Sequence, residues 1–130
     1  MKSKLESLSP NLIVDSVNAS VDFYTKHLGF RLAASVPDTG EYGWAMVERD
    51  GVTVMFQTLK SLQEDMPSLK FDKKGSIGTF FIKMKGIEEL YEQLKSEVEI
   101  TLGWRVTFYG MKEFGIKDPD GYHLVFAEDE

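Results

Sequence analysis

Two stretches of the chain carry apolar residues at the spacing of an amphipathic helix. They span residues 17–28 and 87–98, and each follows a short extended run. Ser16 has the side chain of a helix N-cap, and Gly29 is typical of a helix that ends in a left-handed residue. The pattern therefore predicts a strand followed by a helix in each half of the chain.

Alternating apolar and polar residues predict the strands. They cover 11–14, 30–35, 44–48 and 52–58 in the first half, and 79–84, 106–109, 113–117 and 122–127 in the second. Between the halves, the segment from Ser61 to Glu64 fits a capping box and predicts a short helix, and 72–75 reads as a polar linker. Residues 1–8 and the acidic residues 128–130 are predicted to be tails.

An Asp-Gly dipeptide predicts the turn of the first hairpin. A two-residue turn at Asp50-Gly51 places Trp44 opposite Gln57, and Met46 opposite Met55. These side chains would then share one face of the sheet.

A second Asp-Gly dipeptide lies 70 residues further along, and the same offset aligns the two helices and the strands before them. Transferring the first hairpin by this offset predicts two further pairs, Phe114 opposite Ala127 and Ile116 opposite Val125, unless residues 118–121 form a longer loop. Asp118 and Asp120 are interpreted as turn residues whose side chains accept hydrogen bonds from local backbone N–H groups.

The repeat predicts an α+β fold of two βαβββ modules. We expect one domain over 1–130, with modules at 9–58 and 76–128 and a linker with a short helix at 59–75. Because side chains alternate along a strand, each sheet has one face on its helix and one face without a helix. The face without a helix receives Ser9, Asn11, Thr53, Met55, Gln57, Thr79, Phe81, His123 and Val125. It must be covered by the other module, by another chain or by a ligand.

Composition removes several classes of function. The 130 residues include 15 Lys and Arg against 21 Asp and Glu, and a net charge of −6 disfavours nucleic acid as a partner. The chain has no Cys and 2 His, which excludes thiolate sites and a histidine-rich metal centre. It has no apolar run near the roughly 20 residues that cross a bilayer, and its first residues lack a secretory signal. We therefore expect a cytoplasmic protein that does not bind membranes.

Two motifs resemble the vicinal oxygen chelate superfamily, which includes glyoxalase I, bleomycin-resistance proteins and extradiol dioxygenases. The first comprises residues 12–17, Phe23-Tyr24 and 28–30, and the second comprises 110–114, 118–122 and 126–128. The resemblance covers about residues 8–128. It implies a pair of βαβββ modules whose curled mixed sheets enclose a central cavity, and it implies a homodimer.

The resemblance also indicates where a metal would bind. Metal-dependent members of the superfamily carry His or Glu at four positions, which correspond here to Ser9, Met55, Thr79 and Val125. Hydroxyls, a thioether and an isopropyl group are not donors for a divalent first-row metal. We therefore predict that the protein uses no metal and no other cofactor.

The same face supplies the candidate ligand-binding residues. These are Trp44, Met46, Met55, Gln57, Thr79, Phe81, Tyr109, Phe114, His123 and Val125. Trp44 either stacks on a planar ligand or packs in the core, and Gln57 and Thr79 are the expected polar anchors. His123 is a weak candidate for a general base, and its alternative is a partly exposed strand residue near a turn.

The leading hypothesis is a bleomycin-resistance-like protein that sequesters a small molecule in an apolar, aromatic cavity without a metal. The acidic charge favours a neutral or cationic ligand, and the aromatic residues favour a planar one. Two alternatives stay open at this stage. One is a metal-dependent lyase or isomerase of the glyoxalase I type, and the other is a non-catalytic module that binds another protein.

Overall fold

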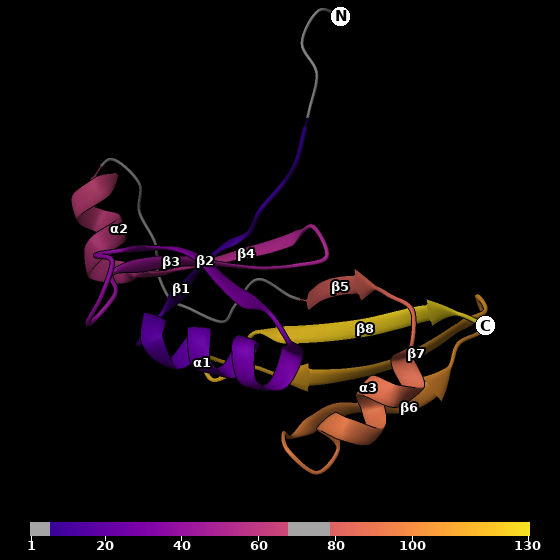
Figure 1. Ribbon diagram of the computed structural model, residues 1–130. Coiled ribbons are helices and arrows are strands. Elements are labelled where there is room, and N and C mark those ends of the chain that lie inside the picture. Colours follow the sequence, from indigo (N-terminus) through magenta and orange to yellow (C-terminus); the bar gives the residue numbers. More distant parts are fainter. Residues whose placement is uncertain (1–5, 68–78) are drawn as a thin grey trace, which may run out of the picture. The chain divides into compact units, whose positions relative to one another are not determined.

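The computed structural model describes residues 6–67 and 79–130 (Figure 1). The chain divides into two compact units, residues 1–71 and 72–130. The first unit contains β1 (Asn11–Val14), α1 (Val17–Leu28), β2 (Arg31–Val36), β3 (Trp44–Arg49), β4 (Val52–Thr58) and α2 (Leu59–Asp65). The second contains β5 (Thr79–Lys83), α3 (Ile87–Leu94), β6 (Ile100–Val106), β7 (Met111–Lys117) and β8 (His123–Asp129).

Each unit holds a four-stranded mixed sheet with the same topology. The strand order is β1-β4-β3-β2 in the first unit and β5-β8-β7-β6 in the second, and in each the first pair is parallel. Asn11 lies opposite Met55 and Phe81 lies opposite Val125, so the two parallel pairs have equivalent registers. The predicted α+β fold with two repeated βαβββ units is therefore confirmed. The central cavity between the modules stays a prediction.

Helix α1 has the boundaries that the sequence predicts. Ser16 is extended, and its Oγ accepts a hydrogen bond from Ala19 N at 3.1 Å, while Gly29 ends the helix at a φ of 71°. The apolar face of α1 packs on the sheet, where the Tyr24 ring lies 4.8 Å from the ring of Phe56. Figure 1 shows α1 along one face of the first sheet. The side chains that alternate with Phe56 along β4 therefore point away from α1.

Several local predictions are wrong at the ends of elements. The strand predicted at 106–109 lies at Ile100–Val106 instead, and the second helix ends at Leu94 rather than at 98. The cap of α2 is Thr58, whose Oγ1 accepts from Ser61 N at 3.1 Å, and not the predicted box starting at Ser61. The first tail residues and the linker predicted at 72–75 lie outside the described residues. None of the described helices provides a segment that could span a bilayer.

The register of the second hairpin also differs from the prediction. Phe114 lies opposite Phe126 rather than Ala127, and Ile116 lies opposite Leu124 rather than Val125. The strands end at the pair Lys117 and His123, so the loop covers 118–122 rather than two residues. Asp118 organises this loop, because its Oδ1 accepts hydrogen bonds from the backbone N of Asp120 at 3.0 Å and of Tyr122 at 2.9 Å. The turn chemistry predicted for Asp118 is confirmed, but it produces a loop that shifts the pairing by one residue.

Helix α3 is capped from another element. Its N-cap is Gly86, which has no side chain, and the Ile87 N–H donates instead to Glu128 Oε1 at 2.9 Å. This hydrogen bond lowers the pKa of Glu128 below its usual value. Glu128 was predicted to lie in a charged tail, which is wrong, because β8 continues through Asp129.

The lowered pKa of Glu128 makes a pH-dependent contribution to stability. A carboxyl whose pKa is depressed in the folded protein stabilises the fold above its ordinary pKa, and this contribution is lost as the pH falls through the lower, folded-state pKa. In Glu128→Gln, the free energy of unfolding should therefore vary less with pH between about 5 and 3 than in the parent protein. Urea unfolding at a series of pH values measures this difference. If the free energies of unfolding of the two proteins change with pH in parallel, the assignment of Glu128 as the cap of α3 is contradicted.

Candidate functional site

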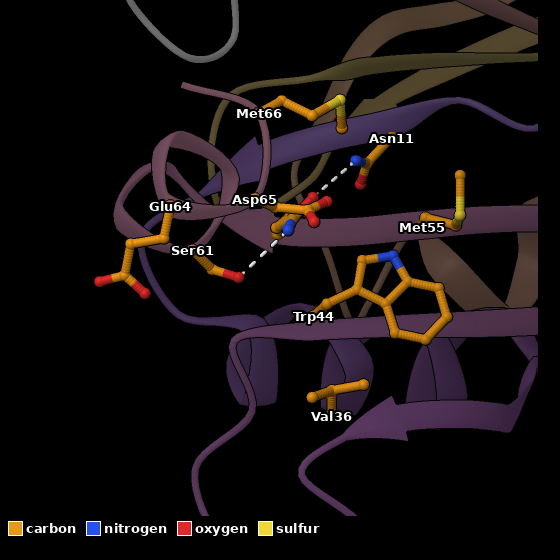
Figure 2. Close-up of a pocket in the computed structure, with 9 residues that line it drawn as sticks. Asn11, Val36, Trp44, Met55, Ser61, Glu64, Asp65 and Met66 are labelled. Atoms are coloured by element: carbon orange, nitrogen blue, oxygen red, sulfur yellow. Dashed lines mark hydrogen bonds between the residues drawn. The ribbon is translucent and has the colours of Figure 1, made fainter. Parts of the chain in front are cut away.

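The first unit contains a pocket on the sheet face that points away from α1 (Figure 2). Its volume is about 610 Å³, which lies within the range of about 300–1,000 Å³ typical of small-molecule sites. The lining residues are Asn11, Val36, Trp44, Met55, Gln57, Ser61, Glu64, Asp65 and Met66. They come from β1, β2, β3, β4, α2 and the residue after α2, so all of them belong to one unit.

Helix α2 forms one side of this pocket because it follows β4 without a loop. Ser61 and Asp65 are one helical turn apart and therefore share a face of α2. Gly43 allows the close approach, since a Cβ at this position would lie 3.2 Å from Ser61 Oγ. The Thr58 N–H donates to Gly43 O at 3.0 Å and holds the start of α2 beside the start of β3.

Three polar side chains form a hydrogen-bonded chain across the pocket wall. Asn11 Nδ2 donates to Gln57 Oε1 at 2.9 Å, and Gln57 Nε2 donates to Ser61 Oγ at 3.1 Å. Both bonds are drawn in Figure 2. Asn11 Oδ1 is buried and accepts a hydrogen bond from no described residue. A buried acceptor without a donor costs about 1–3 kcal/mol, so a donor from a bound molecule would be stabilising there.

The pocket combines an aromatic surface with negative charge. Trp44 and Met55 supply apolar surface, and Glu64 and Asp65 are the only ionisable residues among the lining residues. Figure 2 shows Asp65 directed toward Asn11 and Glu64 directed away from it. Within the described ranges, neither carboxylate forms an ion pair with a basic side chain. An indole beside an unpaired carboxylate is suited to a planar cation.

Three of the predicted ligand-binding residues meet in this pocket. Trp44 lies opposite Gln57 in the β3–β4 hairpin, and Met46 lies opposite Met55, so the predicted pairing is confirmed. Trp44, Met55 and Gln57 line the pocket, whereas Met46 shares the face without being a lining residue. Contact of these residues with a ligand stays a prediction.

Four predicted residues gather on one face of the second sheet. Thr79 lies opposite His123 and Phe81 lies opposite Val125 across β5 and β8. The Phe81 side chain is 57% exposed, and His123 is also exposed. His123 forms no ion pair with a carboxylate in the described parts of the chain. These four residues do not line the pocket of the first unit, and their roles stay predictions.

Phe114 is a core residue rather than a surface for a ligand. The one-residue shift in the second hairpin turns its side chain to the helix side, where it is 0% exposed. Its ring lies 5.1 Å from that of Tyr91 on α3 and 5.3 Å from that of Phe126. Trp104 stacks on the same ring at 6.4 Å, so the second tryptophan also contributes to this aromatic cluster.

The same shift buries Glu113 on the other side of the sheet. Its Oε1 accepts from Arg105 Nη2 at 2.8 Å and Nε at 3.0 Å, and its Oε2 accepts from Tyr109 Oη at 2.7 Å. The hydrogen bond to Glu113 raises the pKa of Arg105. Tyr109, a predicted ligand-binding residue, therefore already uses its hydroxyl within the protein. This cluster could not be predicted from local sequence patterns, because it depends on the register of β7.

The four positions implied for a metal do not form a suitable donor set. Ser9 Oγ is hydrogen-bonded to Thr53 Oγ1, and Met55 contributes a thioether to the pocket. The other two positions, Thr79 and Val125, offer one hydroxyl and a hydrocarbon. Divalent zinc, iron, nickel and manganese are held in proteins mainly by imidazole, carboxylate or thiolate donors, and none of these is present at the four positions. No group of three or more His, Asp or Glu within 6–67 and 79–130 is placed to hold a metal ion. The side chains at these positions therefore do not fit a glyoxalase-type metal.

Most of the residues that complete the pocket are not predicted by the sequence patterns. Asn11 was assigned to the correct face but not to the binding site. Five others, Val36, Ser61, Glu64, Asp65 and Met66, were not considered. The amide of Asn11 on a largely apolar face was the one available signal. The α2 residues carry no such signal, because the sequence of a capped helix after a strand does not show against which surface that helix packs.

Comparisons with solved structures support the fold. TioX from Micromonospora sp. ML1 has a TM-score of 0.78 at 16% identity, over 96% of this chain and 99% of that chain. TnmS3, an antibiotic binding protein from Streptomyces sp. CB03234, has a TM-score of 0.75 at 17% identity, over 98% and 99%. A superfamily member from Sphaerobacter thermophilus DSM 20745 has a TM-score of 0.74 at 22% identity, over 97% and 98%. Identities this low show a shared fold only.

Sequence comparison identifies the family directly. A search of curated proteins finds no significant match. The family model of the Glyoxalase/Bleomycin resistance protein/Dioxygenase superfamily, however, matches residues 7–126, which is nearly the whole chain. The match includes both repeated units, in agreement with the equivalent sheets and the two motifs. The chain therefore belongs to the glyoxalase/bleomycin resistance protein/dioxygenase superfamily.

Proposed function

We propose that this protein binds and sequesters a planar, cationic small molecule in the pocket of the first unit, without a metal. The observation that carries the proposal is the composition of that pocket. Trp44 offers an aromatic surface, Asp65 and Glu64 offer negative charge, and no basic residue lines it among the described residues. Burial of a planar ligand on the indole supplies affinity, and the carboxylates select for positive charge.

Family membership supports the same general function. The superfamily takes part of its name from bleomycin resistance proteins, and one structure with a similar fold is described as an antibiotic binding protein. The donor set at Ser9, Met55, Thr79 and Val125 favours binding over the alternative of a metal-dependent lyase or isomerase. Sequestration requires no catalytic group, so under this proposal His123 needs no catalytic role.

A dye-binding experiment tests this proposal. Thionine is a planar tricyclic dye that is cationic at neutral pH. It is titrated into a Trp104→Phe variant, in which Trp44 is the sole tryptophan. Stacking on Trp44 should quench its fluorescence saturably, and calorimetry should give one site per chain. Resorufin, a planar tricyclic dye of similar size that is anionic at neutral pH, is the control and should bind far more weakly. Equal binding of both dyes, or of neither, would contradict the proposal.

We extend the proposal to a homodimer. Strand β2 is an edge strand of the first sheet, and it exposes the apolar side chains of Leu32 and Val36. Unpaired backbone groups on such an edge favour pairing with another chain. Sedimentation equilibrium at micromolar concentration should give twice the 14.8 kDa mass of one chain. Leu32→Lys should shift the mass toward the monomer, and a parent protein that sediments as a monomer would contradict the extension.

A further inference from the structure

We propose that Asn11 Oδ1 is a specificity-determining acceptor that selects ligands with an N–H donor over their N-methylated counterparts. In this proposal Gln57 is a positioning residue, because it holds the amide of Asn11 in the orientation that presents the oxygen. The inference rests on the proposed function, since it concerns the same pocket. It adds which chemical group of the ligand the pocket recognises and which two side chains are responsible.

The direction of the hydrogen-bonded chain is the first step of the argument. An amide can turn either its N–H₂ or its oxygen toward a neighbour. Asn11 directs Nδ2 to Gln57 Oε1 at 2.9 Å, and Gln57 in turn directs Nε2 to Ser61 Oγ at 3.1 Å. The remaining group of Asn11 on the pocket wall is therefore an acceptor. Gln57 is 5% exposed, so water competes little for this arrangement.

The unsatisfied state of that acceptor is the second step. Asn11 Oδ1 is buried and receives no hydrogen bond within the described residues, although Asn11 itself lines the pocket. A ligand N–H that reaches Oδ1 forms a hydrogen bond without displacing another donor of those residues. Reaching the covered oxygen requires a small movement of the wall. Two of the lining side chains, Met55 and Met66, are unbranched methionines that rearrange at low cost.

The surrounding charge is the third step. Asp65 also lines the pocket and is directed toward Asn11 (Figure 2), so a negative charge accompanies the Asn11 acceptor. An N–H group next to a delocalised positive charge is a strong donor to the Asn11 oxygen, whereas the charge of Asp65 attracts both kinds of cation alike. A cation whose nitrogens are fully methylated is attracted by the charge of Asp65 but donates no hydrogen bond to Asn11 Oδ1. The pocket should therefore distinguish two cations of equal charge and ring structure.

Thionine and methylene blue test this distinction. Both are cationic at neutral pH and share one tricyclic ring system, but thionine carries N–H groups where methylene blue carries N-methyl groups. The parent protein should bind thionine about tenfold more tightly than methylene blue. In Asn11→Leu this ratio of dissociation constants should fall to about one, and in Asn11→Asp, which keeps an acceptor oxygen, the preference should persist. The ratio of the two dissociation constants in each variant is compared with the same ratio in the parent protein. The effect of the added methyl bulk is common to both ratios and therefore cancels.

Gln57→Leu tests the positioning role. Without its partner the Asn11 amide can turn either way, so both dyes should bind while the preference for thionine is lost. Asn11→Leu exchanges one buried acceptor without a donor among the described residues, Asn11 Oδ1, for another, Gln57 Oε1, so its urea midpoint should stay close to the parent value and provides a check on folding.

A preference for thionine that survives Asn11→Leu would overturn the inference while leaving the proposed function intact. A preference for methylene blue in the parent protein would do the same. Absence of binding by either dye to the folded parent protein would overturn the proposed function together with the inference.

Discussion

Replacing Trp44 with alanine should lower the affinity for thionine about 30-fold or more, which corresponds to at least about 2 kcal/mol. Trp44 is the only aromatic residue among the pocket's lining residues. A buried aromatic anchor commonly supplies the largest share of the binding energy of a planar ligand, and a cation gains further from the face of the indole. Calorimetry measures the effect without relying on tryptophan fluorescence.

Two variants make the Trp44 experiment specific. Trp44→Phe keeps a ring and should lose much less affinity than Trp44→Ala. Met46→Ala is the matched control, because Met46 lies on the same strand and face but does not line the pocket. Its affinity for thionine should stay within about twofold of the parent value. Equal losses in Met46→Ala and Trp44→Ala would mean that the dye binds elsewhere on this face.

Replacing Phe114 with alanine should destabilise the protein by about 3–5 kcal/mol. Phe114 is 0% exposed and packs among the rings of Tyr91, Trp104 and Phe126. Truncation removes this burial and leaves a cavity that the surrounding rings can only partly fill. Urea unfolding followed by far-UV circular dichroism gives the change in the free energy of unfolding.

Phe81→Ala is the control for Phe114→Ala. Phe81 lies on β5 and its side chain is 57% exposed. Phe81→Ala should therefore lower the free energy of unfolding by less than about 1 kcal/mol. The pairing that the 70-residue repeat predicts would place Phe114 on the same face as Phe81 and make the two variants similar. Similar stabilities would therefore contradict the observed register, and a large difference would support it.

The two hairpins show why the repeat predicted one register correctly and the other wrongly. In the first, Asp50 and Gly51 both have positive φ, at 52° and 82°, which is the geometry of a two-residue turn that Asp-Gly favours. In the second, the same dipeptide lies inside a longer loop that Asp118 closes with two side-chain hydrogen bonds. A shift of one residue exchanges the two faces of a strand. Phe114 therefore moves into the core, and Glu113 moves to the opposite face.

The candidate site divides in a similar way between what could and could not be predicted. Trp44, Met55 and Gln57 were predicted because strand alternation and a tight turn are local and place side chains on a face. Ser61, Asp65 and Met66 were missed because their contribution depends on how α2 packs beside the sheet. The same limit applies to the Glu128 cap of α3, which joins residues 41 positions apart.

By itself the sequence determined the two repeated units, the positions of their helices and the first hairpin, because each of these follows from spacing and turn residues along the chain. It also determined the family, through its match to the family model over residues 7–126. Only the tertiary structure decided which side chains enclose the pocket, that Asn11 Oδ1 has no donor there among the described residues, and that Glu113 rather than Phe114 faces away from α3. These features depend on strand register and on helix packing. Both are set by contacts between residues distant in the chain, so local patterns carry little information about them.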